Sequence, residues 1–231
     1  MIGIIAELMI SWLLLWLFER TNLSVLGFEL SKERALQVAV GLLLAASCCT
    51  LYHIMAVNFA DNSWTLNTTF TFQAVATSLW FTLKSVIFEE LIFRGALLYI
   101  AIKKIGTTKG CILSAICFGI YHWFSYNALG NLFQMGIIFL MTAVFGLMLA
   151  FAFARTRSLY LPIGLHLGWN IFNIIIFSNG PLGDQIFIKS NDNKLDGLLS
   201  LFVFIFQIFA LPFLGFLYLW YLKTKGSLKA K

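Results

Sequence analysis

The sequence predicts an all-α polytopic membrane protein with about seven transmembrane helices (range six to eight). Of its 231 residues, 60% are hydrophobic and only 11% are charged, against roughly 45–50% and about 25% in soluble domains. A chain of this size cannot hide so much apolar surface in a single soluble core. The composition therefore excludes cytosolic enzymes, secreted domains and disordered chains.

Seven apolar stretches approach the length of about 20 residues that a helix needs to cross the hydrocarbon. The third is far too long for one perpendicular helix and carries four charged side chains. We interpret it as a tilted helix, a kinked helix or two shorter helices. The seven stretches are Ile2–Phe18, Ala35–Val57, Phe70–Ile102, Gly110–Tyr126, Leu132–Ala154, Ser158–Phe177 and Gly197–Leu222.

Basic residues lie at the ends of these stretches and form no patch, so we expect the lipid bilayer as a partner and no nucleic acid. With seven spans, twelve of the 16 Lys and Arg residues share one side, and only Lys189 and Lys194 fall in loops on the other. The positive-inside rule then predicts a cytoplasmic C-terminus and an external N-terminus. Because the chain is short and carries no organelle signal, we expect a prokaryotic plasma membrane.

Ionisable side chains inside a span cost roughly 2.5–3.5 kcal/mol each, and they mark candidate functional sites. In the third stretch, Glu90 and Arg94 are four residues apart and can pair on one helix face. Glu89 projects about 100° away from Glu90. Glu89 is therefore expected to be the unpaired carboxylate of the motif, which suits the role of a general base. The alternative is that all three side chains form a purely structural cluster.

Two further pairs of residues share helix faces. Phe118 and His122 are four apart in the fourth stretch, and His166 and Asn170 are four apart in the sixth. Each pair alone is a weak signal, because a buried histidine is commonly a satisfied core residue. The isolated His53 is interpreted in that structural way. The helix rise places the two pairs and the glutamates at a shared depth, about 12–20 Å from the basic helix ends.

The ordered motifs EExxxR, FxxxH and HxxxN resemble those of the CPBP family of intramembrane proteases. This family, also called CAAX protease and bacteriocin-processing or Abi, includes the type II CAAX prenyl endopeptidase. The resemblance covers about residues 80–176, which we take as the catalytic core of a single transmembrane domain, residues 1–231. It implies hydrolysis of a peptide bond in a membrane-embedded or lipidated substrate, with the active site within the helix bundle. In this chain the motifs read Glu89-Glu90…Arg94, Phe118…His122 and His166…Asn170.

Two chemistries fit these residues. In the first, which needs no cofactor, Glu89 takes a proton from a water molecule that His122 helps to hold. His166 and Asn170 then donate hydrogen bonds to the developing oxyanion, which requires preorganised donors in a dry site. The ion pair of the first motif orients these groups.

In the second chemistry, zinc is the cofactor. His122, His166 and a glutamate bind the metal, and the other glutamate is the base, because two histidines and a carboxylate form a known catalytic zinc set. The sequence has no HExxH motif, which would place two ligands and the base on one helix. Members of the family are commonly classed as metalloendopeptidases, but the resemblance to its structurally known members favours the glutamate-based chemistry. Asn170 agrees with this preference, since a carboxamide is a poor zinc ligand and a good donor.

Two other classes of function remain as alternatives. The first is a non-catalytic membrane protein, such as a bacteriocin-immunity factor or a scaffold. The second is a transporter or channel in which Glu89, His122 and His166 relay protons. A transporter would be indicated by matching broken spans in two symmetric halves, and the irregular third stretch has no such counterpart in the sequence.

Overall fold

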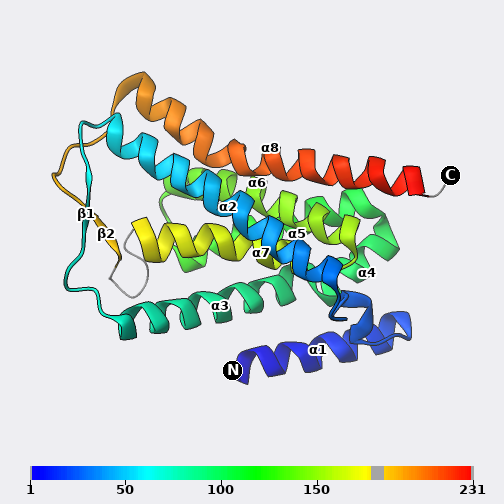
Figure 1. The fold of residues 1–231 in the computed structure, drawn as a ribbon. Helices are drawn as coiled ribbons and strands as arrows, with labels where there is room; N and C mark the ends of the chain where they lie inside the picture. The colour runs from blue at the N-terminus through cyan, green and yellow to red at the C-terminus, as the bar shows by residue number, and fades with distance from the viewer. Residues whose placement is uncertain (1, 178–184, 230–231) are drawn as a thin grey trace.

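The computed structural model describes residues 2–177 and 185–229, with side chains up to residue 224. Helices account for most of the chain (Figure 1), and two short strands, β1 (Trp64–Leu66) and β2 (Phe187–Lys189), pair antiparallel. A 3-10 turn covers Leu23–Leu26, and a π-helix over Ile171–Phe177 continues α7. The α-helices are α1 (Ile2–Glu19), α2 (Lys32–Asn58), α3 (Phe72–Arg94), α4 (Ala96–Ile105), α5 (Thr107–Ser125), α6 (Leu132–Thr156), α7 (Tyr160–Asn170) and α8 (Gly197–Lys229).

The prediction of an all-α polytopic membrane protein is confirmed. Within the described chain, five helical segments are long and apolar enough to cross a membrane: α1, α2, α6, α8 up to Thr224, and α7 with its π-helical extension. Two further long helices, α3 with 23 residues and α5 with 19, carry the charged and histidine motifs. Large apolar side chains on the outer faces are exposed, including those of Trp16, Leu43 and Trp220, as expected where helices face lipid.

The long third stretch of the sequence forms two helices. α3 ends at Arg94, Gly95 follows, and α4 begins at the next residue. A Cβ atom at Gly95 would collide with the carbonyl oxygen of Leu91, so a side chain does not fit this junction. Ser114 of α5 donates a hydrogen bond to the Phe93 carbonyl at 2.7 Å, which satisfies one of the carbonyl groups that the end of α3 leaves free. The chain therefore turns directly after the charged motif.

The long helices alternate in direction, which brings the basic loops to one end of the bundle. α1, α3, α6 and α8 run one way, and α2, α5 and α7 run the other (Figure 1). At the basic end, Lys104 forms an ion pair with Glu19 at 3.4 Å. Arg34 donates there to the Thr156 carbonyl at 2.9 Å. Lys189 lies at the opposite end, in β2.

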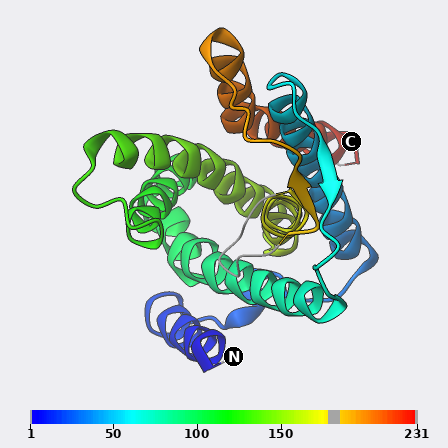
Figure 2. The ribbon, with the colours of Figure 1, turned by 90° about the vertical axis from the view of Figure 1, so that its left-hand side faces the viewer.

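α7 lies inside the bundle, packed against α2, α3 and α6 (Figure 2). Its closest contact is with α2 and depends on glycine. A Cβ atom at Gly164 would lie 2.5 Å from the Val38 carbonyl oxygen, and one at Gly168 would lie 2.5 Å from that of Leu42. Small residues at a crossing let two helix backbones approach closely in membrane bundles. This contact fixes the rotation of α7, which turns His166 toward α3.

Candidate active site

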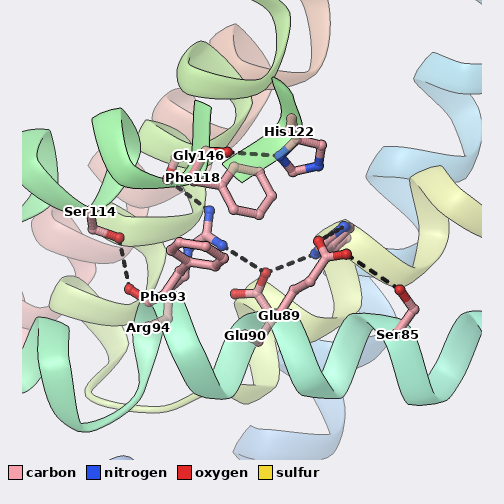
Figure 3. A network of polar contacts seen from close by, with 10 residues as sticks. Ser85, Glu89, Glu90, Phe93, Arg94, Ser114, Phe118, His122 and Gly146 are labelled. Atoms are coloured by element: carbon pink, nitrogen blue, oxygen red, sulfur yellow. Dashed lines mark hydrogen bonds and ion pairs between the residues drawn. The ribbon is translucent and has the colours of Figure 1, made fainter. Parts of the chain in front are cut away.

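The Glu90–Arg94 pair predicted from the first motif is present and fully buried. Arg94 Nη1 donates to Glu90 Oε1 at 3.2 Å, and both side chains are 0% exposed (Figure 3). Arg94 Nη2 donates to the Gly146 carbonyl of α6 at 3.2 Å. The guanidinium also lies 4.1 Å from the ring centroid of Phe118 in α5, in a cation–π contact. One side chain of α3 thus joins three helices.

His166 of α7 lies between the two glutamates of α3. Its Nδ1 is 2.8 Å from Glu90 Oε1. Its Nε2 is 3.7 Å from Glu89 Oε2, which is an ion-pair distance and too long for a hydrogen bond. An ionised carboxylate only accepts hydrogen bonds, so with Glu90 ionised the proton of this contact belongs to Nδ1. The same oxygen of Glu90 therefore accepts from both His166 and Arg94.

Glu89 differs from Glu90 in its access to solvent and in its partners. Its side chain is 13% exposed, against 0% for Glu90, and it lines a cavity. Ser85, one turn earlier on α3, donates to Glu89 Oε1 at 3.3 Å. The expectation that Glu89 lies apart from the Arg94 pair holds, but the expectation that it is unpaired is wrong, because His166 faces it. Glu89 is the accessible carboxylate of the cluster.

His122 of α5 is held by the backbone of its own motif. Its Nδ1 lies 2.7 Å from the Phe118 carbonyl oxygen, one turn earlier. Since a carbonyl oxygen can only accept, Nδ1 carries the proton, and in the neutral ring Nε2 keeps a lone pair. The ring packs edge-on against that of Phe118, with centroids 4.4 Å apart. Phe118 therefore orients His122 through both its carbonyl group and its ring.

A cavity of about 610 Å³ is lined by most of the predicted site residues. It is lined by side chains of α3, α5, α6, α8, α7 and the π-helix. Asn170 lines it without a side-chain hydrogen bond to any described residue, at the point where α7 gives way to the π-helix. Such helix irregularities occur frequently at functional sites. The polar lining residues of the cavity include Ser85, Glu89, His122, His166, Asn170 and Asn173.

The structure thus brings all six predicted site residues to one region, in two layers. Glu89, His122, His166 and Asn170 line the cavity. Glu90 and Arg94 lie behind them and do not reach it.

Two further residues, outside the three motifs, shape this region. Ser85 is four residues before Glu89, a spacing that places both on one helix face and would have indicated the contact. Gly146 carries no such signal, because it is a single glycine in an apolar span. A Cβ atom there would lie 2.8 Å from Phe118 Cδ1 and 3.1 Å from Arg94 Nη2. Gly146 therefore provides the space that the buried guanidinium occupies.

The side chains named in the zinc alternative do not converge on one point. Among residues 2–177 and 185–229, no group of three or more His, Cys, Asp or Glu side chains is placed to hold a metal ion. His166 Nδ1 is bound to Glu90 Oε1, and His122 Nδ1 is bound to the backbone. These contacts leave Nε2 of each ring and the Glu89 carboxylate to act in the cavity.

Comparison with known proteins supports the motif-based resemblance. Residues 71–172 match the family described as type II CAAX prenyl endopeptidase Rce1-like. No curated protein and no solved structure matches the chain. The matched segment runs from the N-cap of α3 into the π-helix and contains all three motifs, whereas α1, α2 and α8 lie outside it. The segment that builds the cluster, residues 71–172, is therefore similar to the Rce1-like family of type II CAAX prenyl endopeptidases.

Proposed function

We propose that this protein is an intramembrane endopeptidase that hydrolyses a peptide bond of a membrane-associated or prenylated protein or peptide, with Glu89 as the general base. One observation carries the proposal. Of two adjacent glutamates, one is sealed against Arg94 and the other faces a cavity that His122 and His166 also line. Two carboxylates in such different environments are suited to different roles.

The first step is the attack of water on the scissile carbonyl carbon. Glu89 accepts one proton of the water, and the lone pair on His122 Nε2 accepts a hydrogen bond from the other. The bond from His122 Nδ1 to the Phe118 carbonyl at 2.7 Å supports this role, because it directs the unprotonated nitrogen away from the backbone. Ser85 holds the other oxygen of Glu89. The water is thereby oriented by two acceptors on different helices.

The second step is the collapse of the tetrahedral intermediate. His166 Nε2–H and the Asn170 amide donate to its oxyanion. In this mechanism His166 carries a proton on each nitrogen throughout the reaction, so that Nδ1 stays bound to Glu90 while Nε2 donates into the cavity. The carbon–nitrogen bond then breaks, and Glu89 returns its proton to the departing amine. Donors fixed before the reaction stabilise such charge more effectively than water does.

Glu90 and Arg94 support this step from behind the cavity. Glu90 fixes the imidazole of His166 through Nδ1, and Arg94 holds Glu90 in place against α5 and α6. With His166 doubly protonated, two carboxylates, one guanidinium and one imidazolium form a neutral cluster. A neutral and hydrogen-bonded cluster lowers the cost of placing charges inside a membrane.

The family match and the site both support the proposed substrate class. The matched family is described as type II CAAX prenyl endopeptidase, and the cavity lies among helices with large exposed apolar side chains. Both observations support a peptide that is embedded in the bilayer or attached to it by a lipid as the substrate. We further propose a prokaryotic plasma membrane as the location of the enzyme.

Cleavage by the purified protein tests the proposal. The protein is reconstituted in liposomes with a library of membrane-spanning peptides and a set of prenylated peptides, and the products are identified by mass spectrometry. Wild type is compared with Glu89→Ala and His122→Ala. Specific products from wild type alone support the proposal. Absence of products from all three proteins, or equal products from all three, contradicts it.

The basic end of the bundle supports the proposed orientation, with the N-terminus outside and the C-terminus in the cytoplasm. A reporter active only in the cytoplasm, fused after Lys231, is expected to be active. The same reporter inserted at Asn193, in the loop before α8, is expected to be inactive. The reverse pattern contradicts this orientation.

A further inference from the structure

A buried histidine outside the three motifs is attached to the wall of the cavity. His53 of α2 is 7% exposed, and its Nε2 lies 3.0 Å from Asn173 Oδ1 in the π-helix. The ring stacks on Phe177, with centroids 5.0 Å apart, and packs edge-on against Tyr52 at 4.7 Å. These two aromatic contacts hold the imidazole plane and so define the position of Nε2.

This contact sets the orientation of the Asn173 carboxamide. A carboxamide oxygen accepts but cannot donate, so Nε2 of His53 carries the proton of the bond. Asn173 lines the cavity. Its Nδ2 forms no hydrogen bond to any described residue and is not among the fully buried polar atoms that lack a partner. With Oδ1 held by His53, the two N–H groups of Nδ2 remain available to a ligand in the cavity.

Asn173 lies some distance from the reacting centre along the same helical axis. It follows His166 by seven residues, which corresponds to roughly 10 Å of helix. An extended peptide advances about 3.3 Å per residue. A substrate lying along α7 with its scissile bond at His166 therefore presents a backbone carbonyl to Asn173 about three residues away.

We propose that Asn173 is a substrate-binding residue that donates from Nδ2 to a backbone carbonyl of an extended peptide, and that His53 is the positioning residue that orients it. This inference rests on the proposed endopeptidase function. In this arrangement the backbone of the bound peptide lies along α7 and the π-helix. It also gives His53, which the sequence favours as purely structural, a role in substrate affinity.

The test variant is Asn173→Asp, which keeps an oxygen for His53 and replaces the donor nitrogen by a second oxygen. The matched control is Asn131→Asp at the N-cap of α6, where the oxygen accepts from Gln134 and the nitrogen has no assigned role. For a long peptide substrate, loss of one hydrogen bond raises KM about tenfold in Asn173→Asp. Its kcat stays within about twofold, and both constants are unchanged in Asn131→Asp.

Peptide length supplies a second readout. Substrates are shortened residue by residue from each end up to the scissile bond. When the peptide is shortened from one of its two ends, the difference in KM between wild type and Asn173→Asp disappears once fewer than about three residues remain between that end and the scissile bond. A difference that persists for the shortest peptides from both ends overturns the proposal.

His53 is tested through Asn173. His53→Phe keeps an aromatic ring against Tyr52 and Phe177 but removes the N–H donor, so it raises KM about as much as Asn173→Asp does. His53→Gln supplies an N–H donor again and returns KM to the wild-type value. In the Asn173→Asp background, His53→Phe causes no further rise, because residues that act through one contact are not additive. Equal effects in both backgrounds overturn the positioning role.

Failure of the two proposals is distinguishable. An active wild type whose KM is unchanged by Asn173→Asp overturns this inference alone. A wild type that cleaves none of the peptides removes the endopeptidase function and this inference with it.

Discussion

The imidazole of His166 donates from Nδ1 to Glu90 across 2.8 Å, joining two residues that are 76 positions apart in the sequence. This contact fastens α7 to α3 at the level of the cavity. The same contact turns His166 Nε2 toward Glu89. Glu90 therefore determines which imidazole nitrogen of His166 faces Glu89. The buried carboxylate of Glu90 thus orients the imidazole that faces Glu89, although Glu90 itself does not line the cavity.

Glutamine at position 89 keeps the size of the side chain and removes the proton acceptor. A positioned general base contributes about 10²–10⁴-fold, so we expect the rate of peptide cleavage to fall by that range while abundance in the membrane stays normal. The control is Glu7→Gln, the same change at a carboxylate of α1 that does not line the cavity. Equal rates in the two variants would contradict the assignment of Glu89.

Asn170→Leu removes an amide donor and keeps the volume of the side chain approximately constant. Because a single oxyanion donor typically contributes about 10²–10³ in kcat, we expect kcat to fall by that factor with KM within about twofold. Steady-state kinetics on one identified substrate measure both constants. An effect confined to KM would show that Asn170 binds substrate and does not stabilise the oxyanion.

Arg94→Ala leaves Glu90 in a buried site without its guanidinium. Removing one partner of a buried pair costs about 3–5 kcal/mol, so the variant is expected to be poorly expressed and to unfold at lower temperature. The double variant Arg94→Leu with Glu90→Leu is expected to regain abundance and remain inactive, because His166 loses its orienting carboxylate.

The control for this experiment is Lys104→Ala, which breaks the ion pair with Glu19. The Lys104 side chain is 60% exposed, and such pairs contribute below about 1 kcal/mol. A thermal shift for Arg94→Ala no larger than that of the control would show that the buried pair does not stabilise the fold.

Gly146→Ala tests the space occupied by the guanidinium. The added Cβ would lie 2.8 Å from Phe118 Cδ1 and 3.1 Å from Arg94 Nη2, so we expect a destabilisation of about 1–3 kcal/mol from overpacking. Gly136→Ala, also in α6, meets no atom within 4 Å and is expected to leave the melting temperature unchanged or slightly raised. Similar melting temperatures for the two variants would contradict the packing around Arg94.

The sequence was sufficient to predict the membrane fold and the residues that assemble, because both depend on strong local signals. Apolar length identifies spans, and a charge inside a span is costly enough to mark a site. The Glu90–Arg94 pair was predictable from its four-residue spacing alone.

Other features depend on contacts between helices, which spacing along one helix does not encode. The contact of His166 with both glutamates requires the rotation of α7 against α2. The break at Gly95 was one of three interpretations of a long apolar stretch, since the collision that requires glycine exists only in the folded turn. The contact between His53 and Asn173 joins α2 to a π-helix, and hydrophobic periodicity along the sequence does not indicate a π-helix.

The measurement that tests the central claim most directly is peptide cleavage by wild type and Glu89→Ala in liposomes, each with and without a strong zinc chelator. The glutamate mechanism predicts that wild-type cleavage survives the chelator and that Glu89→Ala is inactive in both conditions. Wild-type cleavage that is lost with the chelator and restored by added zinc would contradict it, and would assign His122 and His166 to a metal.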